Sequence, residues 1–421
     1  MSDQLPDPGP PEPSTPVPSP YPYPPEELDT LKQKLDLTRF PDELDDAGWD
    51  YGAPLADIKR LVARWKNGYD WRKHEAALNA ELPQFTRDID VEGFGTLNVH
   101  YVHKKSALET AIPLLFVHGW PGSYIEARKI APLLTTVQPD RPSFHVVALS
   151  LPGYGFSEAP TKKGFRIAQY AEVCNKLMLA LGYNEYVTQG GDWGSMITRK
   201  LATMYGPKHI KAWHTNFPTV SAPDFSLYPL RLLTSLSMLL QLPFLSSAEW
   251  TGLRRSQDVA RTGLGYLRMQ TTKPQTLGYA LTDSPVGLLA WIYEKLVAWT
   301  DGYPWDDDEI LTWISIYYFS RSGPAASLRI YYEVFNEGAL IPSVHDTQPT
   351  IPMGMSFFPG ELVNLPKSWL RRTGHVVFES SHTMGGHFAA HEVPELLAGD
   401  LRKMFGREGP AAGVVKARTG Y

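Results

Sequence analysis

The chain has 421 residues, of which 43% are hydrophobic and 20% are charged, and its formal net charge is −5. This length and composition are typical of a globular protein that buries a large core in two or three structural units. The modest negative charge gives no reason to expect nucleic acid or an anionic membrane as a partner, and the single cysteine, Cys174, excludes an intrachain disulfide.

Proline occupies eleven of the first 25 positions. Such a run cannot form helix or sheet ladders and has little to bury, so we expect a disordered or extended arm over residues 1–25. The first residues lack a basic region followed by an apolar run, and no apolar segment approaches the ~20 residues of a membrane helix. We therefore expect no signal peptide, no integral membrane anchor and a cytoplasmic location.

The next segment, residues 26–105, has its own pattern. Apolar residues at helical spacing between Leu55 and Trp65 predict a helix with one buried face, and alternation over residues 97–103 predicts a strand. We interpret this part as a leading segment that precedes the main domain.

Strands and helices alternate over residues 106–221. Apolar runs predict strands at 113–117, 144–149, 185–189 and 210–214, and helix-like runs occupy 167–183 and 195–202. The same pattern resumes over residues 336–421, with strands at 350–357 and 376–379 and a closing helix at 394–404. This alternation favours a mostly parallel sheet that is covered by helices on both faces.

Residues 222–335 interrupt this pattern with helical segments that are rich in aromatic residues. They predict a helical lid that is inserted into the α/β core. Within them the run 232–245 is the most apolar. We interpret it as part of a lid helix, and a peripheral membrane contact is the alternative.

Residues 190–195, with the sequence GGDWGS, join a predicted strand to a predicted helix. A strand, a turn of small residues and a helix form a nucleophile elbow, in which glycines leave room for the sharp turn. Asp192 stands where a hydrolase normally carries serine. Aspartate is already ionised at neutral pH and can displace at a strained or activated carbon, leaving an alkyl ester. A similar run centred on Ser157 leads into no helix directly and is interpreted as a decoy.

A nucleophile elbow requires an acid and then a histidine later in the chain. His387 is the candidate base because it lies in a glycine-flanked loop after the last predicted strand. Glu361, in the loop after the preceding strand, is the candidate orienting acid, and Asp346 is its rival. Three other histidines lack flanking glycines: His375, His382 and His391.

An oxyanion hole requires two backbone N–H groups. We expect one from Trp193, directly after the nucleophile, and one from Trp120 in the run HGWPGS at 118–123, which follows a predicted strand. The sequence contains no phosphate loop, dinucleotide fingerprint or metal-ligand spacing. We therefore expect a reaction that needs no cofactor and no metal.

Together these motifs resemble the epoxide hydrolases of the α/β-hydrolase fold, most closely their microsomal-type branch. The resemblance covers the chain from about residue 26 and rests on YDWR at 69–72, HGWPGS at 118–123, PGYGFS at 152–157, the Asp192 elbow, DSPVGL at 283–288 and GHFA at 386–389. It implies an α/β-hydrolase fold with a mostly parallel central sheet, an inserted helical lid and an N-terminal meandering segment. A proline-rich arm stands where the microsomal relatives have an anchor.

The resemblance also implies two lid tyrosines that donate hydrogen bonds to the epoxide oxygen. Tyr266, upstream of Thr-Lys-Pro, matches the first, and Tyr331, in Ile-Tyr-Tyr-Glu, matches the second, with Tyr332 as a one-residue alternative. The implied reaction converts a small hydrophobic epoxide, xenobiotic or lipid, and water into a vicinal diol, as in detoxification. The ester on Asp192 is hydrolysed by water that His387 activates.

Two other functions are consistent with parts of this pattern. A haloalkane dehalogenase shares the aspartate, the histidine and the ester, but it has no use for two lid phenols. A catalytically inactive binding protein of the same fold would have no need for an intact triad. The sequence leaves a homodimer open.

Overall fold

The computed structural model describes residues 25–220, 240, 244–336 and 347–421. The proline-rich arm up to residue 24, most of the apolar run 232–245 and the rival acid Asp346 lie outside the described residues. No described helix combines the length and the apolar character that a membrane crossing requires.

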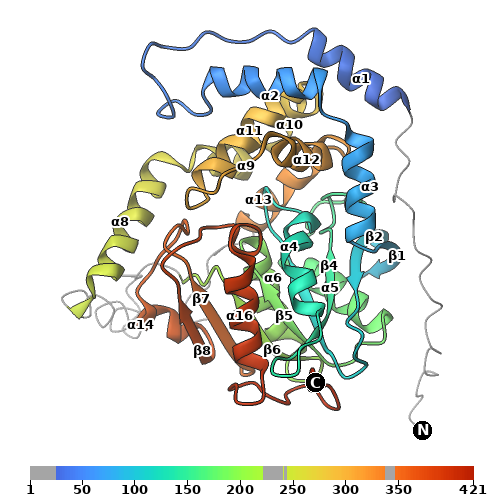
Figure 1. Cartoon of the computed structure of the whole chain (residues 1–421), viewed down its shortest axis with the longest axis vertical. Coiled ribbons are helices and arrows are strands. Elements are labelled where there is room, and N and C mark those ends of the chain that lie inside the picture. Colours follow the sequence, from blue (N-terminus) through green and yellow to red (C-terminus); the bar gives the residue numbers. More distant parts are fainter. Residues whose placement is uncertain (1–24, 221–239, 241–243, 337–346) are drawn as a thin grey trace.

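An eight-stranded sheet in the order β1-β2-β4-β3-β5-β6-β7-β8 forms the centre of the molecule (Figure 1). Its strands are β1 (Gln84–Val91), β2 (Gly95–Lys104), β3 (Ile112–Val117), β4 (Phe144–Leu149), β5 (Tyr186–Gly190), β6 (Ile210–Thr215), β7 (Pro352–Phe357) and β8 (His375–Ser381). β1, β2 and β4 pair antiparallel in that order, and all pairs from β4 to β8 are parallel. The mostly parallel sheet predicted from the sequence is therefore confirmed.

Helices cover both faces of the sheet, as a buried parallel sheet requires. α4 (Ala127–Thr135) and α16 (Pro394–Phe405) pack against each other on one face, and α5 (Ile167–Ala180) and α6 (Trp193–Tyr205) do so on the other (Figure 1). β3 and β4 are buried along their whole length. β3, β5 and β7 are parallel, so the polypeptide leaves all three at the same end of the sheet, the end formed by the carboxyl ends of the strands. Ligands bind there in folds of this kind.

A layer of helices lies over this carboxyl end of the sheet (Figure 1). It contains α8 (Ser247–Thr262), α9 (Gly265–Thr272), α10 (Pro274–Asp283), α11 (Pro285–Ala298), α12 (Asp307–Tyr318), the short 3-10 helix η3 (Ala326–Leu328) and α13 (Arg329–Phe335). This layer falls in the part of the sequence where helical, aromatic-rich segments were predicted.

The leading segment packs on the outside of this layer before it enters the sheet. α1 (Pro25–Asp36) and α2 (Leu55–Asn67) lie across the α10–α12 helices, and α3 (Trp71–Glu81) leads into β1 (Figure 1). Arg64 donates two hydrogen bonds of 2.7 and 2.8 Å to the carboxylate of Asp308 on α12. Lys34 pairs with Asp283 at 2.6 Å. The apolar face predicted for α2 is buried at Ile58, Leu61, Val62 and Trp65.

The remaining elements follow β7 and β8. The short helices α14 (Lys367–Leu370) and η4 (Arg371–Thr373) lie between these strands in sequence, and α15 (Ala389–Glu392) precedes α16.

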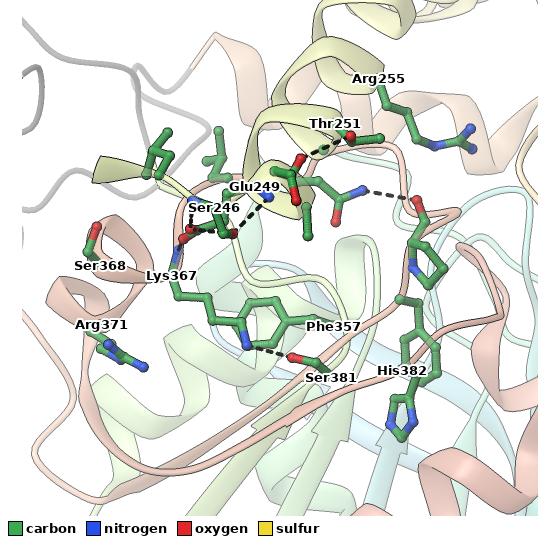
Figure 2. Close-up of a pocket in the computed structure, with 18 of the residues that line it drawn as sticks. Ser246, Glu249, Thr251, Arg255, Phe357, Lys367, Ser368, Arg371, Ser381 and His382 are labelled. Atoms are coloured by element: carbon green, nitrogen blue, oxygen red, sulfur yellow. Dashed lines mark hydrogen bonds between the residues drawn. The ribbon is translucent and has the colours of Figure 1, made fainter. Parts of the chain in front are cut away.

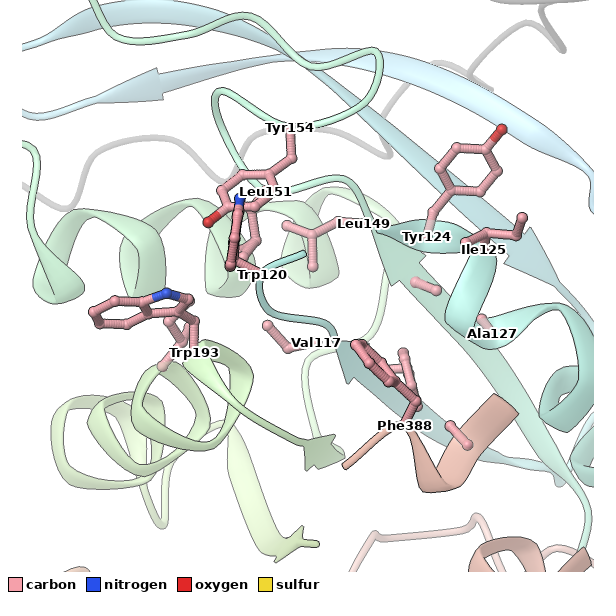
Figure 3. Packing of buried hydrophobic residues seen from close by; sticks show 14 of the residues in the cluster. Val117, Trp120, Tyr124, Ile125, Ala127, Leu149, Leu151, Tyr154, Trp193 and Phe388 are labelled. Atoms are coloured by element: carbon pink, nitrogen blue, oxygen red, sulfur yellow. The ribbon is translucent and has the colours of Figure 1, made fainter. Parts of the chain in front are cut away.

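Aromatic side chains fill the core below the lid. Figure 3 shows Trp120, Trp193 and Phe388 on three different segments around Val117, at the end of β3, with Tyr124 and Ile125 of the η1 turn (Tyr124–Glu126) nearby.

Candidate active site

Asp192 occupies the sharp turn between β5 and α6. Its backbone angles are φ 47° and ψ −126°, which a non-glycine residue adopts only at a cost, and such strain is typical of a nucleophile elbow. The turn leaves no room for side chains at its neighbours. A first side-chain carbon at Gly194 would lie 1.9 Å from the Val117 carbonyl oxygen, and one at Gly119 would lie 2.1 Å from Asp192 Oδ1. The local sequence is therefore the one that this turn demands.

The Trp120 backbone N–H donates a hydrogen bond of 2.8 Å to Asp192 Oδ1. This N–H belongs to the loop after β3, where a second oxyanion donor was expected. Trp193 is the first residue of α6, so its N–H is one of the helix N-terminal donors that have no partner within the helix. Both tryptophans are almost completely buried.

His387 lies between two carboxylates. Its Nε2 is 3.5 Å from Asp192 Oδ2, and its Nδ1 is 2.6 Å from Glu361 Oε1. Glu361 Oε1 also accepts a hydrogen bond of 2.6 Å from the Leu362 N–H. Glu361 and His387 are buried, at 2% and 5% exposure. The structure thus brings together the three side chains that the sequence singled out as candidate nucleophile, base and acid.

Burial and charge act on His387 in opposite directions. Burial lowers the pKa of His387, but the charges of Glu361 and Asp192 and their hydrogen bonds outweigh it and raise this pKa well above its usual range. The imidazole therefore carries a proton in the resting protein. A base in this state must first lose one of its anionic neighbours.

Tyr266 and Tyr331 line the same cavity as Asp192, which has a volume of about 180 Å³. Their rings are 6.0 Å apart and nearly perpendicular. The Tyr266 ring stacks on Trp120 at 5.3 Å, and the Tyr331 ring meets Trp193 edge-on at 4.8 Å. The Tyr331 hydroxyl is buried and has no hydrogen-bond partner among the described residues. Burial, with a contribution from the Asp192 charge, raises the pKa of both phenols, so both stay protonated.

The alternatives considered from the sequence lie elsewhere. Tyr332 is 40% exposed and does not line the cavity. His375 is exposed, His382 pairs with Asp400, and His391 pairs with Glu309. The decoy Ser157 donates to the Ser150 carbonyl oxygen at 2.6 Å in the core.

Two residues near the site were not found from the sequence. Burial raises the pKa of Glu126 to about 8, and this carboxyl packs against Gly122, where a first side-chain carbon would lie 1.6 Å from its Oε1. The buried Lys295 ammonium is 4.8 Å from the Tyr266 ring centroid. No sequence pattern marks either residue, although each lies a few residues after a recognised motif. Within the described ranges, no group of three His, Cys, Asp or Glu side chains is arranged to hold a metal ion.

A second and larger cavity, of about 840 Å³, lies beside the N-terminal part of α8 (Figure 2). Gly252 and Arg255 of α8 line this cavity, whereas Val259 of the same helix lines the cavity beside Asp192. The triad residues and the two phenols are absent from its lining. Arg255 instead donates hydrogen bonds of 2.6 and 2.9 Å to the backbone carbonyl oxygens of Gly360 and Glu361, on the loop that carries the acid.

The comparisons with known proteins agree with this geometry. A family model described as the epoxide hydrolase N terminus matches residues 16–127, and one described as the alpha/beta hydrolase fold matches residues 112–303. Epoxide hydrolase 1 of Sus scrofa is 37% identical over 409 residues, which cover 90% of this chain and 86% of that protein.

Solved structures give the same result. An enantioselective mutant of an epoxide hydrolase from Aspergillus niger superposes with a TM-score of 0.78 at 34% identity, covering 94% of this chain and 96% of that one. The juvenile hormone epoxide hydrolase of the silkworm Bombyx mori gives a TM-score of 0.77 at 31% identity, with 89% and 90% covered. The chain therefore belongs to the epoxide hydrolase family, has the α/β-hydrolase fold, and is an enzyme that hydrolyses epoxides.

Proposed function

We propose that the first half-reaction is attack by Asp192 on a ring carbon of an epoxide bound in the 180 Å³ cavity. The new bond is the ester C–O bond to the carboxylate, and the bond that breaks is the ring C–O bond. Tyr266 and Tyr331 donate hydrogen bonds to the ring oxygen, and one of them transfers its proton as the alkoxide forms. Their place in the lining of the same cavity as Asp192 supports these roles.

In the second half-reaction water attacks the carbonyl carbon of the ester on Asp192. His387 Nε2 accepts a proton from this water, and Glu361 stabilises the imidazolium through Nδ1. The N–H groups of Trp120 and Trp193 hold the oxyanion. The proton that His387 carries in the resting protein passes to the phenolate before water attacks, so the imidazole is free to accept. The ester then cleaves to the diol and free Asp192 as the leaving alkoxide takes the proton of the intermediate's hydroxyl, and the proton from water stays on His387. The sum is epoxide plus water to diol, with every group restored.

The convergence of Asp192, His387 and two buried phenols on one apolar cavity carries this proposal. Its other lining is largely aromatic or aliphatic, for example Phe217, Leu264 and Trp299, which favours a hydrophobic substrate. Its volume is below the 300–1,000 Å³ range of sites for drug-sized ligands, so we propose a compact epoxide. Two phenols beside the nucleophile favour an alkoxide over a halide leaving group.

Trapping the ester tests the proposal. The first step needs no base, so H387Q should react once and stall, and intact-mass spectrometry should show one epoxide mass added per chain. Peptide mapping should place it on residues 190–195, and an additional Asp192→Ala change should abolish it. H375Q is the matched control, because His375 is exposed at the start of β8. An adduct that survives the loss of Asp192 would exclude this carboxylate as the nucleophile.

We further propose a division of labour along the chain. Residues 26–105 brace the lid, residues 106–221 and 336–421 form the catalytic core, and residues 222–335 act as the lid. Tyr266, Trp299 and Tyr331 support the last assignment, because all three enter the cavity from helices or loops of that range. We propose that the enzyme acts in the cytoplasm. Disulfides are rare in that reducing compartment, and a chain with one cysteine forms none within itself. Sedimentation of the full chain distinguishes a monomer from a homodimer.

A further inference from the structure

The backbone of the loop that carries His387 is anchored at three consecutive residues. The N–H groups of Gly385, Gly386 and His387 donate hydrogen bonds of 2.9 Å to Asp301 Oδ2, Glu392 Oε1 and the Trp299 carbonyl oxygen, in that order. Asp301 and Trp299 belong to the loop after α11, in the lid. The loop that carries His387 is therefore held partly by the lid, and not only by the α/β core to which this loop belongs.

Glu392, at the end of α15, joins these two loops. Its Oε1 accepts from the Gly386 N–H, and its Oε2 accepts from the Asp301 N–H, also at 2.9 Å. The loops are in close contact here. A first side-chain carbon at Gly386 would lie 2.6 Å from the Trp299 carbonyl oxygen and 2.9 Å from Glu392 Oε1. A carboxylate that bridges two backbone donors fixes the distance between them.

The ionised carboxylate is a strong acceptor at both oxygens, whereas the acid form turns one oxygen into a hydroxyl, which accepts a hydrogen bond only weakly. Burial raises the pKa of Glu392 to about 7, although the hydrogen bonds from Asp301 and Gly386 act to lower it. The bridged and the singly bonded forms of this contact are therefore both accessible near neutral pH.

We propose that Glu392 is a positioning residue for ester hydrolysis. Its carboxylate holds the loop of His387 against the lid loop 299–301, and thereby keeps Nε2 directed at the ester on Asp192. This inference rests on the proposed roles of His387 and Asp192. Glu392 itself lines neither cavity and touches no reacting atom.

Charged and titratable groups lie near Glu392 on the lid, on the loop of Glu361 and on the segment that contains Glu392 itself. Asp301 and Tyr303 face it from the lid, Glu361 from the acid loop, and His387 and His391 from its own side. Glu361 raises the pKa of Glu392 and His387 lowers it. Burial keeps the pKa of Tyr303 high, so this phenol stays neutral and adds no charge near pH 7.

The variant E392Q tests the proposal, because the amide keeps the size of the side chain but has one acceptor in place of two. A small displacement of a catalytic group costs up to about 100-fold in rate. We therefore expect ester hydrolysis to slow by about tenfold or more, while alkylation stays within about threefold. Steady-state kcat and KM should then fall by the same factor and leave kcat/KM unchanged, and intact-mass spectrometry should show ester during turnover.

Two further variants complete the design. E395Q is the matched control, because Glu395 is an exposed carboxylate three residues further along, and it should behave as the parent protein. D301A removes only the acceptor for Gly385 from an exposed side chain, so it should fold and show the same effect in smaller degree. In the parent protein hydrolysis should slow on the acid side of neutrality as Glu392 takes up a proton, and E392Q should make this limb shallower.

The outcomes separate the inference from the function on which it rests. A normal kcat in E392Q and D301A, an unchanged acid limb, or a fall in kcat/KM without ester would overturn the positioning role. If H387Q also accumulates no ester, the proposed roles of His387 and Asp192 are wrong. If H387Q accumulates ester and E392Q does not, only the inference about Glu392 fails.

Discussion

Replacing Tyr331 with Phe should raise stability and lower activity at the same time. The side chain is 2% exposed, and its hydroxyl makes no hydrogen bond of good geometry among the described residues, although the Tyr266 hydroxyl and the Trp193 indole lie near it. The ring contacts with Trp193 and Trp120, at 4.8 and 5.8 Å, do not depend on the hydroxyl. A buried hydroxyl without a partner costs about 1–3 kcal/mol, so we expect Y331F to gain about 1 kcal/mol after the small space left by the oxygen is allowed for.

The same hydroxyl is a proposed donor to the ring oxygen in the first half-reaction. Removing one donor from a comparable oxyanion site costs about 10²–10³ in rate. Tyr266 remains in Y331F, so we expect a loss near the lower limit, about 100-fold in the rate of alkylation. A gain in stability together with a loss of activity is typical of a residue retained for function.

Calorimetry would give the change in stability, and single-turnover diol formation from an aryl epoxide would give the change in rate. Y332F is the matched control, because it removes the same atom one residue further on from a side chain that is 40% exposed. We expect this control to match the parent protein in both measurements. The reasoning fails if Y331F is destabilised with normal alkylation, or if Y332F reproduces the loss of activity.

Three other predictions follow from the site and its surroundings. Glu361→Gln should leave alkylation intact and slow ester hydrolysis, because a neutral amide orients the imidazole but cannot stabilise the imidazolium; the same phenotype in Asp346→Asn instead would identify the other carboxylate as the acid. The double variant Y266F/Y331F should nearly abolish diol formation while each single variant keeps part of it, and near-normal turnover would refute both assignments. Although burial opposes it, pairing with His391 and Lys129 lowers the pKa of Glu309 to about 2, so the stability this group contributes is present above about pH 4.5 and is lost as the pH falls towards 2. The melting temperatures of the parent protein and E309Q should therefore converge over that range, and a constant difference would contradict it.

The strands in the middle of the sheet were predictable because they are buried on both faces and therefore appear in the sequence as continuous apolar runs, as in β3 and β4. β1 was missed, because it lies at the sheet edge and its sequence, QFTRDIDV, has no such run. α4 was also missed, because it contains Pro132, and proline is unfavourable in the interior of a helix. The helix predicted over 167–183 ends at Ala180, because Gly182 adopts φ 83° and the Tyr183 N–H bonds to the Met178 carbonyl oxygen.

The elbow around Asp192 was predictable because its geometry depends on neighbours in the sequence. His387 and Glu361 followed from chain order and loop position in a fold of this kind. The two tyrosines came only from the family resemblance, since no local pattern distinguishes them among 21 tyrosines. Glu392 could not be found in this way, because its proposed role depends on contact between the lid loop 299–301 and a loop that is more than eighty residues away, as in the Gly385–Asp301 bond.

In the proposed mechanism, the charge on Asp192 links the two half-reactions. His387 Nε2 is 3.5 Å from Asp192 Oδ2, so the carboxylate charge directly favours the protonated form of the imidazole. In the resting enzyme this charge helps to raise the pKa of His387 and of both phenols. Attack on the epoxide turns the carboxylate into a neutral ester. The phenols then become stronger acids while the alkoxide needs a proton, and His387 becomes able to lose its own proton before water attacks. The base is thus released for hydrolysis only after the ester that it must hydrolyse has formed.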